Sequence, residues 1–342
     1  MKKKKPSIAV LRLSALGDAV LVVPLINQLL SSGKFQKVSW ITTQSVVDLI
    51  GPIPGCSYIV VDKVKSLKTL FLNWLKFKKF NFDILIVAQA SFSAHSISFF
   101  TKAKKKIGFD RRRGKDLHHL FIDESINYKD QHFVEAYMNL GELAGAPIIK
   151  PHWGKAFGHL SCKWAKSLRA NGKRLVALHP HASKLERRWS NDGYVRVIKS
   201  LLKENCDILI LGGDSELEKK LNLEIAKSFG PEIKNLTGEL SLVQWASLLR
   251  EVNLLIAPDT GAVHLANALS TKVVGLYAVA NPMLTGPLNG LENCINRYPQ
   301  AVSNFSGKVD GDYHHRVHDE RAMSLIGFDD VWPKITKALG LS

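Results

Sequence analysis

Three stretches of the sequence carry residues whose types and spacing suit chemistry. The first is Ser14–Asp18, in which Gly17 permits a tight turn and Asp18 supplies a carboxylate. A carboxylate at this place can act as a general base that accepts the proton of a substrate hydroxyl. It can equally be an acidic residue that the start of a helix favours through its dipole. The residues by themselves leave both roles of Asp18 open.

The second stretch, from His179 to Trp189, combines a hydroxyl group with several cations. Ser183 supplies the hydroxyl, and the cations are Lys184, Arg187 and Arg188. Charge-assisted hydrogen bonds from such groups can clamp a phosphate. A solvated basic loop has the same composition, so a phosphate clamp is one of two interpretations.

The third stretch has the sequence APDTGAVH and ends at His264. An apolar run stops at Asp259, and a helix is expected to begin at Thr260 or Gly261. The free N–H groups of a helix start, together with the helix dipole, form an anion-binding site. An ordinary helix capped by Asp259 or Thr260 is the alternative.

Each stretch follows a short apolar run and precedes a segment with helical spacing, and this alternation recurs along the chain. The runs that we expect to be strands are Ile8–Leu13, Val38–Thr42, Tyr58–Val61, Asp83–Ala88, Leu175–His179, Asp207–Leu211, Ile233–Leu236, Leu254–Ala257 and Val273–Tyr277. Continuously apolar strands between helices indicate parallel sheets that are covered on both faces. We therefore expect an α/β fold of two Rossmann-like domains, residues 1–160 and 161–342, with a ligand cleft at the carboxyl ends of the strands.

Composition excludes several classes of protein and indicates an anionic partner. The chain has 342 residues, of which 46% are hydrophobic and 23% charged, as in a soluble globular protein. No uninterrupted apolar run is long enough for a membrane-spanning helix. The N-terminus resembles a signal peptide, but Arg12 and Asp18 interrupt its apolar run, so we expect strand, turn and helix there. The net charge is +17, and residues 1–160 carry 24 Lys and Arg against 11 Asp and Glu.

Other motifs give weak signals or are absent. The sequence has no Walker A motif, no GxGxxG and no GxSxG, and it has no helix-turn-helix or RNA-recognition signature. Asp310 and Asp312 have the D-x-D spacing of metal-dependent sugar transferases, and His314, His315 and His318 are spaced as metal ligands can be. The aspartates do not lie directly after an apolar strand, and no nearby cysteine supports the histidines, so we expect no metal site.

Together, the three stretches resemble glycosyltransferase family 9, the ADP-heptose:lipopolysaccharide heptosyltransferases. The segment LRLSALGDAVLVVPLINQL is similar to the family's first strand, its glycine–aspartate turn and its first helix. The segments APDTGAVHLANAL and VVGLYAVANPMLTGP resemble its most characteristic region, and ERRWS resembles its basic-tryptophan element. The resemblance extends over most of the chain.

The resemblance implies a GT-B architecture, in which two Rossmann-like domains with parallel sheets face each other. The N-terminal domain then binds a lipid acceptor and the C-terminal domain a nucleotide-sugar donor, and it stays open whether the last helix packs back on the N-terminal domain. The transfer is inverting and needs neither a metal nor a cofactor. Asp18 matches the family's general base. The expected donor-binding residues are Ser183, Lys184, Arg187, Glu216, Leu240, Asp259, Thr260, Gly261 and His264.

One donor residue departs from the family pattern. The family usually has a lysine two residues before the tryptophan, where this chain has Arg187, which keeps the charge but has a different geometry. On the acceptor side, the basic N-terminal half suits an anionic glycolipid. The cations expected to attract it are Lys102, Lys104, Lys105, Lys106, Arg111, Arg112 and Arg113.

We therefore expect an inverting, metal-independent transfer of heptose from ADP-heptose to the inner core of lipopolysaccharide. The enzyme is expected in the cytoplasm, peripheral at the inner face of the inner membrane and without a nucleic-acid partner. The basic, aromatic segment Lys65–Lys79 either touches that membrane or packs as an ordinary helix with a basic outer face. The alternatives are a family 9 transferase for another sugar, a sugar-nucleotide epimerase of the same fold, and a non-catalytic binder of anionic lipid or nucleic acid.

Overall fold

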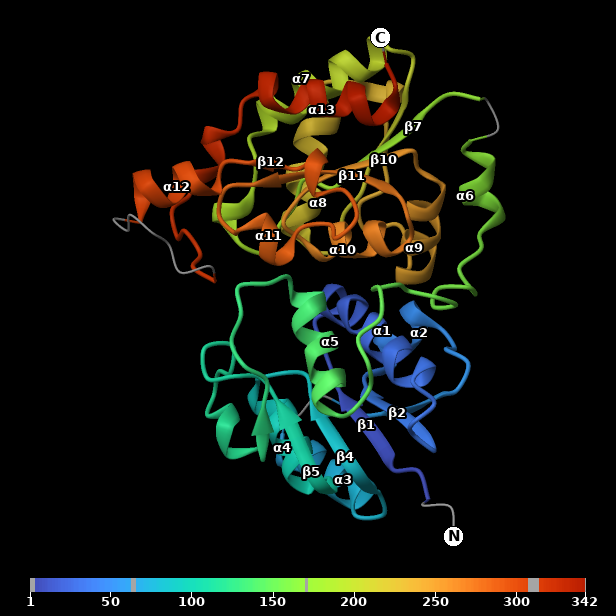
Figure 1. Ribbon diagram of the computed structural model, residues 1–342. Coiled ribbons are helices and arrows are strands. Elements are labelled where there is room, and N and C mark those ends of the chain that lie inside the picture. The colour runs from blue at the N-terminus through green and yellow to red at the C-terminus, as the bar shows by residue number, and fades with distance from the viewer. Residues whose placement is uncertain (1–3, 63–65, 170–171, 307–313, 342) are drawn as a thin grey trace. The chain divides into compact units, whose positions relative to one another are not determined.

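A computed structural model describes residues 4–62, 66–169, 172–306 and 314–341. The chain divides into two compact units, Met1–His159 and Leu160–Ser342, each with its own sheet. Figure 1 shows the two sheets and the helices that flank them. Among the described residues, no helix has both the length and the apolar character that crossing a membrane requires.

The first unit contains a six-stranded parallel sheet in the order β3-β2-β1-β4-β5-β6. Its strands are β1 (Ser7–Leu11), β2 (Lys37–Thr42), β3 (Cys56–Val60), β4 (Asn81–Val87), β5 (Lys102–Gly108) and β6 (Glu124–Ser125). The chain moves outward from β1 to β3 and then returns to β4 on the other side of β1. The strand order therefore reverses between β1 and β4, where ligands of such sheets usually bind.

Helices cover both faces of this sheet. They are α1 (Leu16–Ser31), α2 (Gln44–Ile50), α3 (Leu67–Phe77), α4 (Phe92–Phe100) and α5 (Phe133–Leu143). On one face, Phe77 of α3 and Ile97 of α4 share an apolar cluster with Leu11 and Leu85. Val10 and its neighbours alternate with these residues along the strands and are equally buried, so the second face is covered as well.

The second unit repeats this architecture with a parallel sheet in the order β12-β11-β10-β7-β8-β9. Its strands are β7 (Leu175–Leu178), β8 (Asp207–Ile210), β9 (Lys234–Asn235), β10 (Leu254–Pro258), β11 (Lys272–Tyr277) and β12 (Ile295–Asn296). Its helices are α6 (Lys163–Ser167), α7 (Asn191–Lys203), α8 (Glu216–Ala226), α9 (Leu242–Glu251), α10 (Gly261–Ala268), α11 (Pro282–Thr285), α12 (Tyr298–Phe305) and α13 (Phe328–Leu339). The expected α/β fold with two parallel sheets is confirmed.

The last helix, α13, packs into the core of the second unit. Its Val331 and Ile335 are fully buried and belong to the same apolar cluster as Val197 and Ile198 of α7. An apolar stripe of this kind is buried against the nearest available apolar surface, which here is the helix-covered face of the second sheet. The buried side of α13 therefore contributes to the core of the second unit.

Candidate active site

Asp18 lies in the first turn of α1, directly beyond the carboxyl end of β1. Its carboxylate accepts a hydrogen bond from the guanidinium of Arg12, and its Oδ2 atom is 3.4 Å from the backbone nitrogen of Ala15. The side chain of Asp18 is 43% exposed, whereas that of Arg12 is 9% exposed. The carboxylate therefore supports the helix start and is also accessible to a substrate, so the two roles that the sequence leaves open are compatible.

Two residues that directly follow β4, Ala88 and Gln89, form hydrogen bonds with the segment that leads to Asp18. Arg12 Nη1 donates to the backbone oxygen of Ala88 at 2.8 Å and to the Tyr137 hydroxyl at 2.9 Å. Gln89 Oε1 accepts the backbone N–H groups of Leu13, at 2.8 Å, and of Ser14, at 3.2 Å. Sequence reasoning missed Arg12 and Gln89 as supporting residues. The available signal was the position of Arg12, a charged residue at the end of an apolar strand.

In the second unit, Arg187 and Asp259 are neighbours. Arg187 Nη1 is 3.5 Å from Oδ2 of Asp259 and donates to its backbone oxygen at 3.3 Å. Asp259 is buried directly beyond β10, where a carboxylate requires such a partner. The buried Nε atom of Arg187 has no hydrogen-bond partner within the described parts of the chain. Since a guanidinium has five N–H donors, Arg187 can bind Asp259 and an anionic ligand together.

Thr260 and Gly261 form the start of α10 beside this ion pair. Thr260 is the N-cap residue, but its hydroxyl makes no capping bond, and its buried Oγ1 atom lacks a partner among residues that the structure describes. His264 lies in the same helix and is 7% exposed. A buried hydroxyl, a helix N-terminus and an arginine at one strand end form a site that suits a diphosphate.

The loops beyond β7 and β8 meet at Glu218. Its carboxylate accepts the backbone N–H of Gly213, and Oε1 is 3.3 Å from Nε2 of His181. Burial lowers the pKa of His181 below its ordinary value. Glu216, one of the expected donor-binding residues, has a side chain that is 91% exposed and pairs with Lys219. The structure therefore brings Glu218, and not Glu216, to the edge of the sheet.

The other expected donor residues lie on loops at the same sheet edge. Ser183 and Lys184 are exposed in the loop that follows β7. Leu240 is half-buried in the loop that follows β9, and the N–H of Gly238 in that loop is 3.4 Å from the oxygen of Gly212. Ser183 and Lys184 therefore lie in the same loop as Arg187, and Leu240 lies in a loop two strands away, beyond β9.

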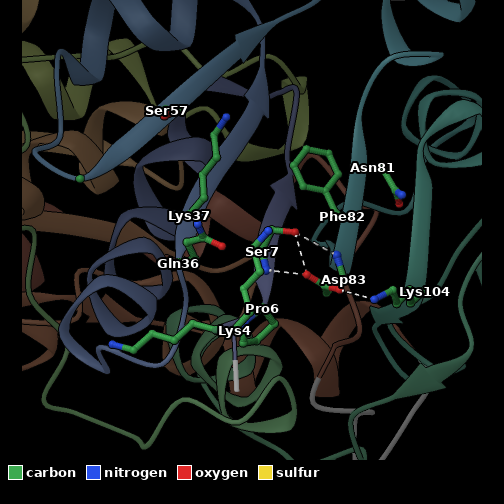
Figure 2. A pocket seen from close by; sticks show the side chains of 12 residues that line it. Lys4, Pro6, Ser7, Gln36, Lys37, Ser57, Asn81, Phe82, Asp83 and Lys104 are labelled. Atoms are coloured by element: carbon green, nitrogen blue, oxygen red, sulfur yellow. Dashed lines mark hydrogen bonds and ion pairs between the residues drawn. The ribbon is translucent and has the colours of Figure 1, made fainter. Parts of the chain in front are cut away.

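The structure does not bring the expected acceptor cations together. Lys102, Lys104, Lys105 and Lys106 lie along β5. Lys104 lines a cavity of about 820 Å³ at the amino ends of the strands, where Asp83 Oδ1 is 2.7 Å from its Nζ (Figure 2). Since parallel strands all begin at one edge, Lys104 lies at the opposite edge of the sheet from Asp18.

The remaining cations of this group differ in burial and partners. Lys105 pairs with Glu124 of β6, and Lys106 donates to the backbone oxygen of Ser98 at 2.6 Å. Arg113 is buried, where it donates to Asp110 at 2.6 Å. Arg111 and Arg112 are exposed beyond the carboxyl end of β5, at the same sheet edge as Asp18.

The metal candidates of the sequence gain no support from the described residues. No group of three His, Cys, Asp or Glu side chains lies close enough there to hold a metal ion. Asp310 and Asp312 lie outside the described residues. His318 Nδ1 is 3.5 Å from a carboxylate oxygen of Glu186 and is largely exposed.

Comparison with known proteins assigns the chain to a family. Residues 74–309 match the model of glycosyltransferase family 9 (heptosyltransferase). The lipopolysaccharide core heptosyltransferase OpsX of Haemophilus influenzae is 28% identical over 303 residues, which are 88% of this chain and 87% of that protein. Lipopolysaccharide heptosyltransferase 2 of Salmonella typhimurium is 25% identical over 70% of this chain and 72% of its own length.

Solved structures show the same fold. A family 9 glycosyl transferase from Veillonella parvula matches with a TM-score of 0.77 at 18% identity, over 100% of this chain and 99% of that one. The heptosyltransferase WaaC of E. coli, solved with ADP, matches with a TM-score of 0.74 at 17% identity, over 97% and 99% of the two chains. The GT-B class of fold that the sequence predicts is thereby confirmed. The family match, which covers more than half of the sequence, shows that this chain is a glycosyltransferase and belongs to family 9.

Proposed function

We propose that this chain transfers a heptose from ADP-heptose to the inner core of lipopolysaccharide. Membership of family 9 and the lipopolysaccharide core heptosyltransferase among its relatives support this choice. The observation that carries it is the group Arg187, Asp259 and Thr260 at the carboxyl edge of the second sheet. An epimerase and a non-catalytic binder do not account for the family match.

The second unit then binds the donor. Arg187 and the N–H groups at the start of α10 stabilise the diphosphate, whose negative charge grows as it leaves. Asp259 holds Arg187 in place, and the Thr260 hydroxyl and His264 lie where they can contact the sugar or the diphosphate. Glu218 lies where a carboxylate can accept hydrogen bonds from hydroxyl groups of the donor. Ser183, Lys184 and Leu240, on the loops that follow β7 and β9, are proposed to contact the donor as well.

The first unit binds the acceptor, and Asp18 is its base. The acceptor hydroxyl oxygen attacks the anomeric carbon while the bond from this carbon to the diphosphate oxygen breaks. Asp18 takes the hydroxyl proton, and ADP leaves with the bonding electron pair. Attack from the side opposite the leaving group inverts the anomeric centre. NMR of the product therefore should give the anomeric configuration opposite to that of the donor.

The transfer is proposed to need no metal ion, because Arg187 and the α10 N-terminus supply positive charge to the departing diphosphate. Activity that persists in excess EDTA would support this assignment. Loss of activity in EDTA that Mg²⁺ restores would show that a metal carries part of that charge.

We propose further that the enzyme works in the cytoplasm, at the inner face of the inner membrane. The acceptor is an anionic glycolipid, and the excess of positive charge in residues 1–160 is attracted to anionic lipid. Arg111 and Arg112 are the expected cations whose position, at the sheet edge of Asp18, suits contact with this acceptor.

A thermal-shift comparison of nucleotide sugars tests the donor. A ligand at a hundred times its dissociation constant adds about 2.7 kcal/mol to the stability of the protein, which raises the melting temperature measurably. ADP-heptose should raise it more than UDP- or GDP-linked sugars at equal concentration. Stabilisation by a UDP- or GDP-linked sugar alone would identify this chain as a family 9 transferase for another sugar.

A further inference from the structure

The outer faces of α3 and α4 expose large apolar side chains that the fold does not use. These residues, which we call the α3–α4 face, are Phe71, Leu72, Trp74, Leu75, Phe92 and Phe99, and their exposure ranges from 37% to 70%. The two helices pack against each other beside β4 and β5 (Figure 1). Their opposite sides are already buried through Phe77 and Ile97, so the exposed residues do not serve the core. Exposed apolar side chains concentrated in this way mark an interaction site.

The segment that contains α3 and α4 is strongly basic. Between Ser66 and Ile107 the sequence contains one acidic residue, Asp83, which is paired with Lys104 at 2.7 Å. Lys68, Lys78 and Lys79 are exposed on and beside α3. The Lys78 ammonium lies 5.6 Å from the centre of the Trp74 ring. Aromatic side chains among lysines are typical of helices that lie in the headgroup region of an anionic bilayer.

One end of this face adjoins the turn that carries Asp18. Gln89 accepts hydrogen bonds from the Leu13 and Ser14 backbone and donates to Ser91 Oγ at 2.9 Å. Ser91 is the N-cap residue of α4, and the exposed Phe92 follows it. A surface that covers α4 therefore extends to the sheet edge at which the acceptor is expected.

We propose that the α3–α4 face binds the surface of an anionic phospholipid bilayer, with its aromatic side chains in the headgroup region and its lysines on the lipid phosphates. We favour an anionic bilayer over a neutral apolar partner because the lysines beside the aromatic side chains complement the negative charge of the lipid phosphates. This proposal rests on the proposed function, because docking on a membrane would bring a lipid-linked acceptor to Asp18. Binding to lipid itself is measured without any turnover.

Sedimentation with vesicles tests the proposal. Full-length protein should sediment with vesicles of phosphatidylcholine and phosphatidylglycerol but hardly with phosphatidylcholine alone. Each lysine near an anionic surface strengthens binding roughly fivefold, so Lys68→Glu/Lys78→Glu/Lys79→Glu should weaken it by about a hundredfold. The control Lys199→Glu/Lys203→Glu/Lys220→Glu, with exposed lysines of α7 and α8, changes the net charge equally and should retain most binding.

Two double variants test the contribution of the apolar side chains of the α3–α4 face. Phe71→Ser/Phe99→Ser should weaken vesicle binding by about tenfold or more, because burial of these rings in the headgroup region is lost. Leu217→Ser/Leu223→Ser, which changes exposed leucines of α8, should not. Equal losses in both pairs, or equal binding to neutral and anionic vesicles, would overturn the proposal. So would a dimer that Phe71→Ser/Phe99→Ser dissociates, since a second copy of the chain would then cover the face.

An activity measurement separates this proposal from the proposed function. The Lys68→Glu/Lys78→Glu/Lys79→Glu variant should transfer sugar normally to a water-soluble, deacylated acceptor and poorly to the same acceptor in vesicles. Equal activity of this variant and the wild type on the vesicle-bound acceptor would contradict membrane docking. If the wild type transfers sugar to neither acceptor, the proposed function fails, while vesicle sedimentation still decides the docking.

Discussion

The guanidinium of Arg12 is almost fully buried and is bonded to the carboxylate of Asp18, which is nearly half exposed. Ala88 and Tyr137 also accept hydrogen bonds from this guanidinium, so the group that binds Oδ2 of Asp18 is itself held in place. This arrangement orients the carboxylate without burying it. It also explains why a cation stands at the end of an apolar strand.

Replacement of Asp18 by asparagine tests its role as the base. Asn keeps the size and can still accept a hydrogen bond from Arg12, but it cannot take the proton of the acceptor hydroxyl. We expect kcat to fall at least about 100-fold, with donor affinity and melting temperature nearly unchanged. Steady-state kinetics with calorimetric donor titration measure both quantities.

Asp48→Asn provides the matched control, because Asp48 is an exposed aspartate of the same unit. Asn at position 18 can still accept a hydrogen bond from the Ala15 N–H, so the helix start should persist in Asp18→Asn. If Asp18→Asn retained the wild-type rate, Asp18 would only support the helix, and collapse of the rate in Asp259→Asn would transfer the role of the base to Asp259.

Arg187 should carry a large part of donor affinity. Arg187→Ala removes one or two charge-assisted hydrogen bonds to the diphosphate, each worth about 1.5–3 kcal/mol. The donor Kd should rise roughly tenfold or more, as isothermal titration with ADP-heptose or ADP measures. Arg187→Lys, the residue usual in the family, should retain most activity. Unchanged donor affinity in Arg187→Ala would remove this residue from the site.

Comparison of variants at Glu218 and Glu216 tests which of the two glutamates contacts the ribose or the sugar of the donor. Glu218→Gln should weaken donor binding about tenfold, since it removes a charged acceptor at the carboxyl ends of the strands worth about 1.5 kcal/mol. Glu216→Gln should leave donor binding unchanged, because that side chain is directed into solvent. Isothermal titration of each variant with the same donor measures the two Kd values. A larger loss of affinity in Glu216→Gln than in Glu218→Gln would show that Glu216 contacts the donor.

The buried histidines His95 and His118 predict a loss of stability in acid. Nε2 of His95 is 2.9 Å from Nδ1 of His118, and the Phe109 N–H donates to Nε2 of His118. Burial lowers the pKa of His118 from 6.5 to about 4. Between these values the unfolded chain binds a proton that the folded chain does not, so stability falls as the pH decreases through this window.

The fall attributable to His118 is about 3 kcal/mol and should level off below a pH of about 4. Melting curves of wild type and His118→Gln over this range measure it, because the variant lacks the titrating ring. His119→Gln, which changes the exposed neighbour, serves as control and should behave like the wild type. Identical pH dependence of wild type and His118→Gln would refute the assignment.

The central strands could be predicted from the sequence because they are covered on both faces and are therefore continuously apolar. The strand β5 could not, since its sequence KAKKKIG contains four lysines. It forms because β4 pairs with it along its length and because Asp83 and Glu124, from other strands, neutralise Lys104 and Lys105. Lys104, Lys105 and Lys106 thus each bind a different partner, so the lysines of β5 do not form one patch.

The predicted site residues that lie at strand ends are at the expected edges of the sheets, as Asp18 and Asp259 show. The supporting residues were missed because their contacts join distant parts of the chain: Gln89 binds the backbone of Leu13, 76 residues away. Glu218 had a local signal that was not used. Ser215 and Glu218 have the spacing of a helix capping motif, which turns the second residue back toward the preceding loop.

The proposed activity of this chain is the transfer of heptose from ADP-heptose to a lipopolysaccharide inner core. Mass spectrometry of a heptose-free lipopolysaccharide acceptor, incubated with ADP-heptose and the purified protein, measures this directly. We predict that the acceptor gains the mass of one heptose residue while an equal amount of ADP is released. An unchanged acceptor mass, with the donor intact or converted to an epimer, would contradict the claim.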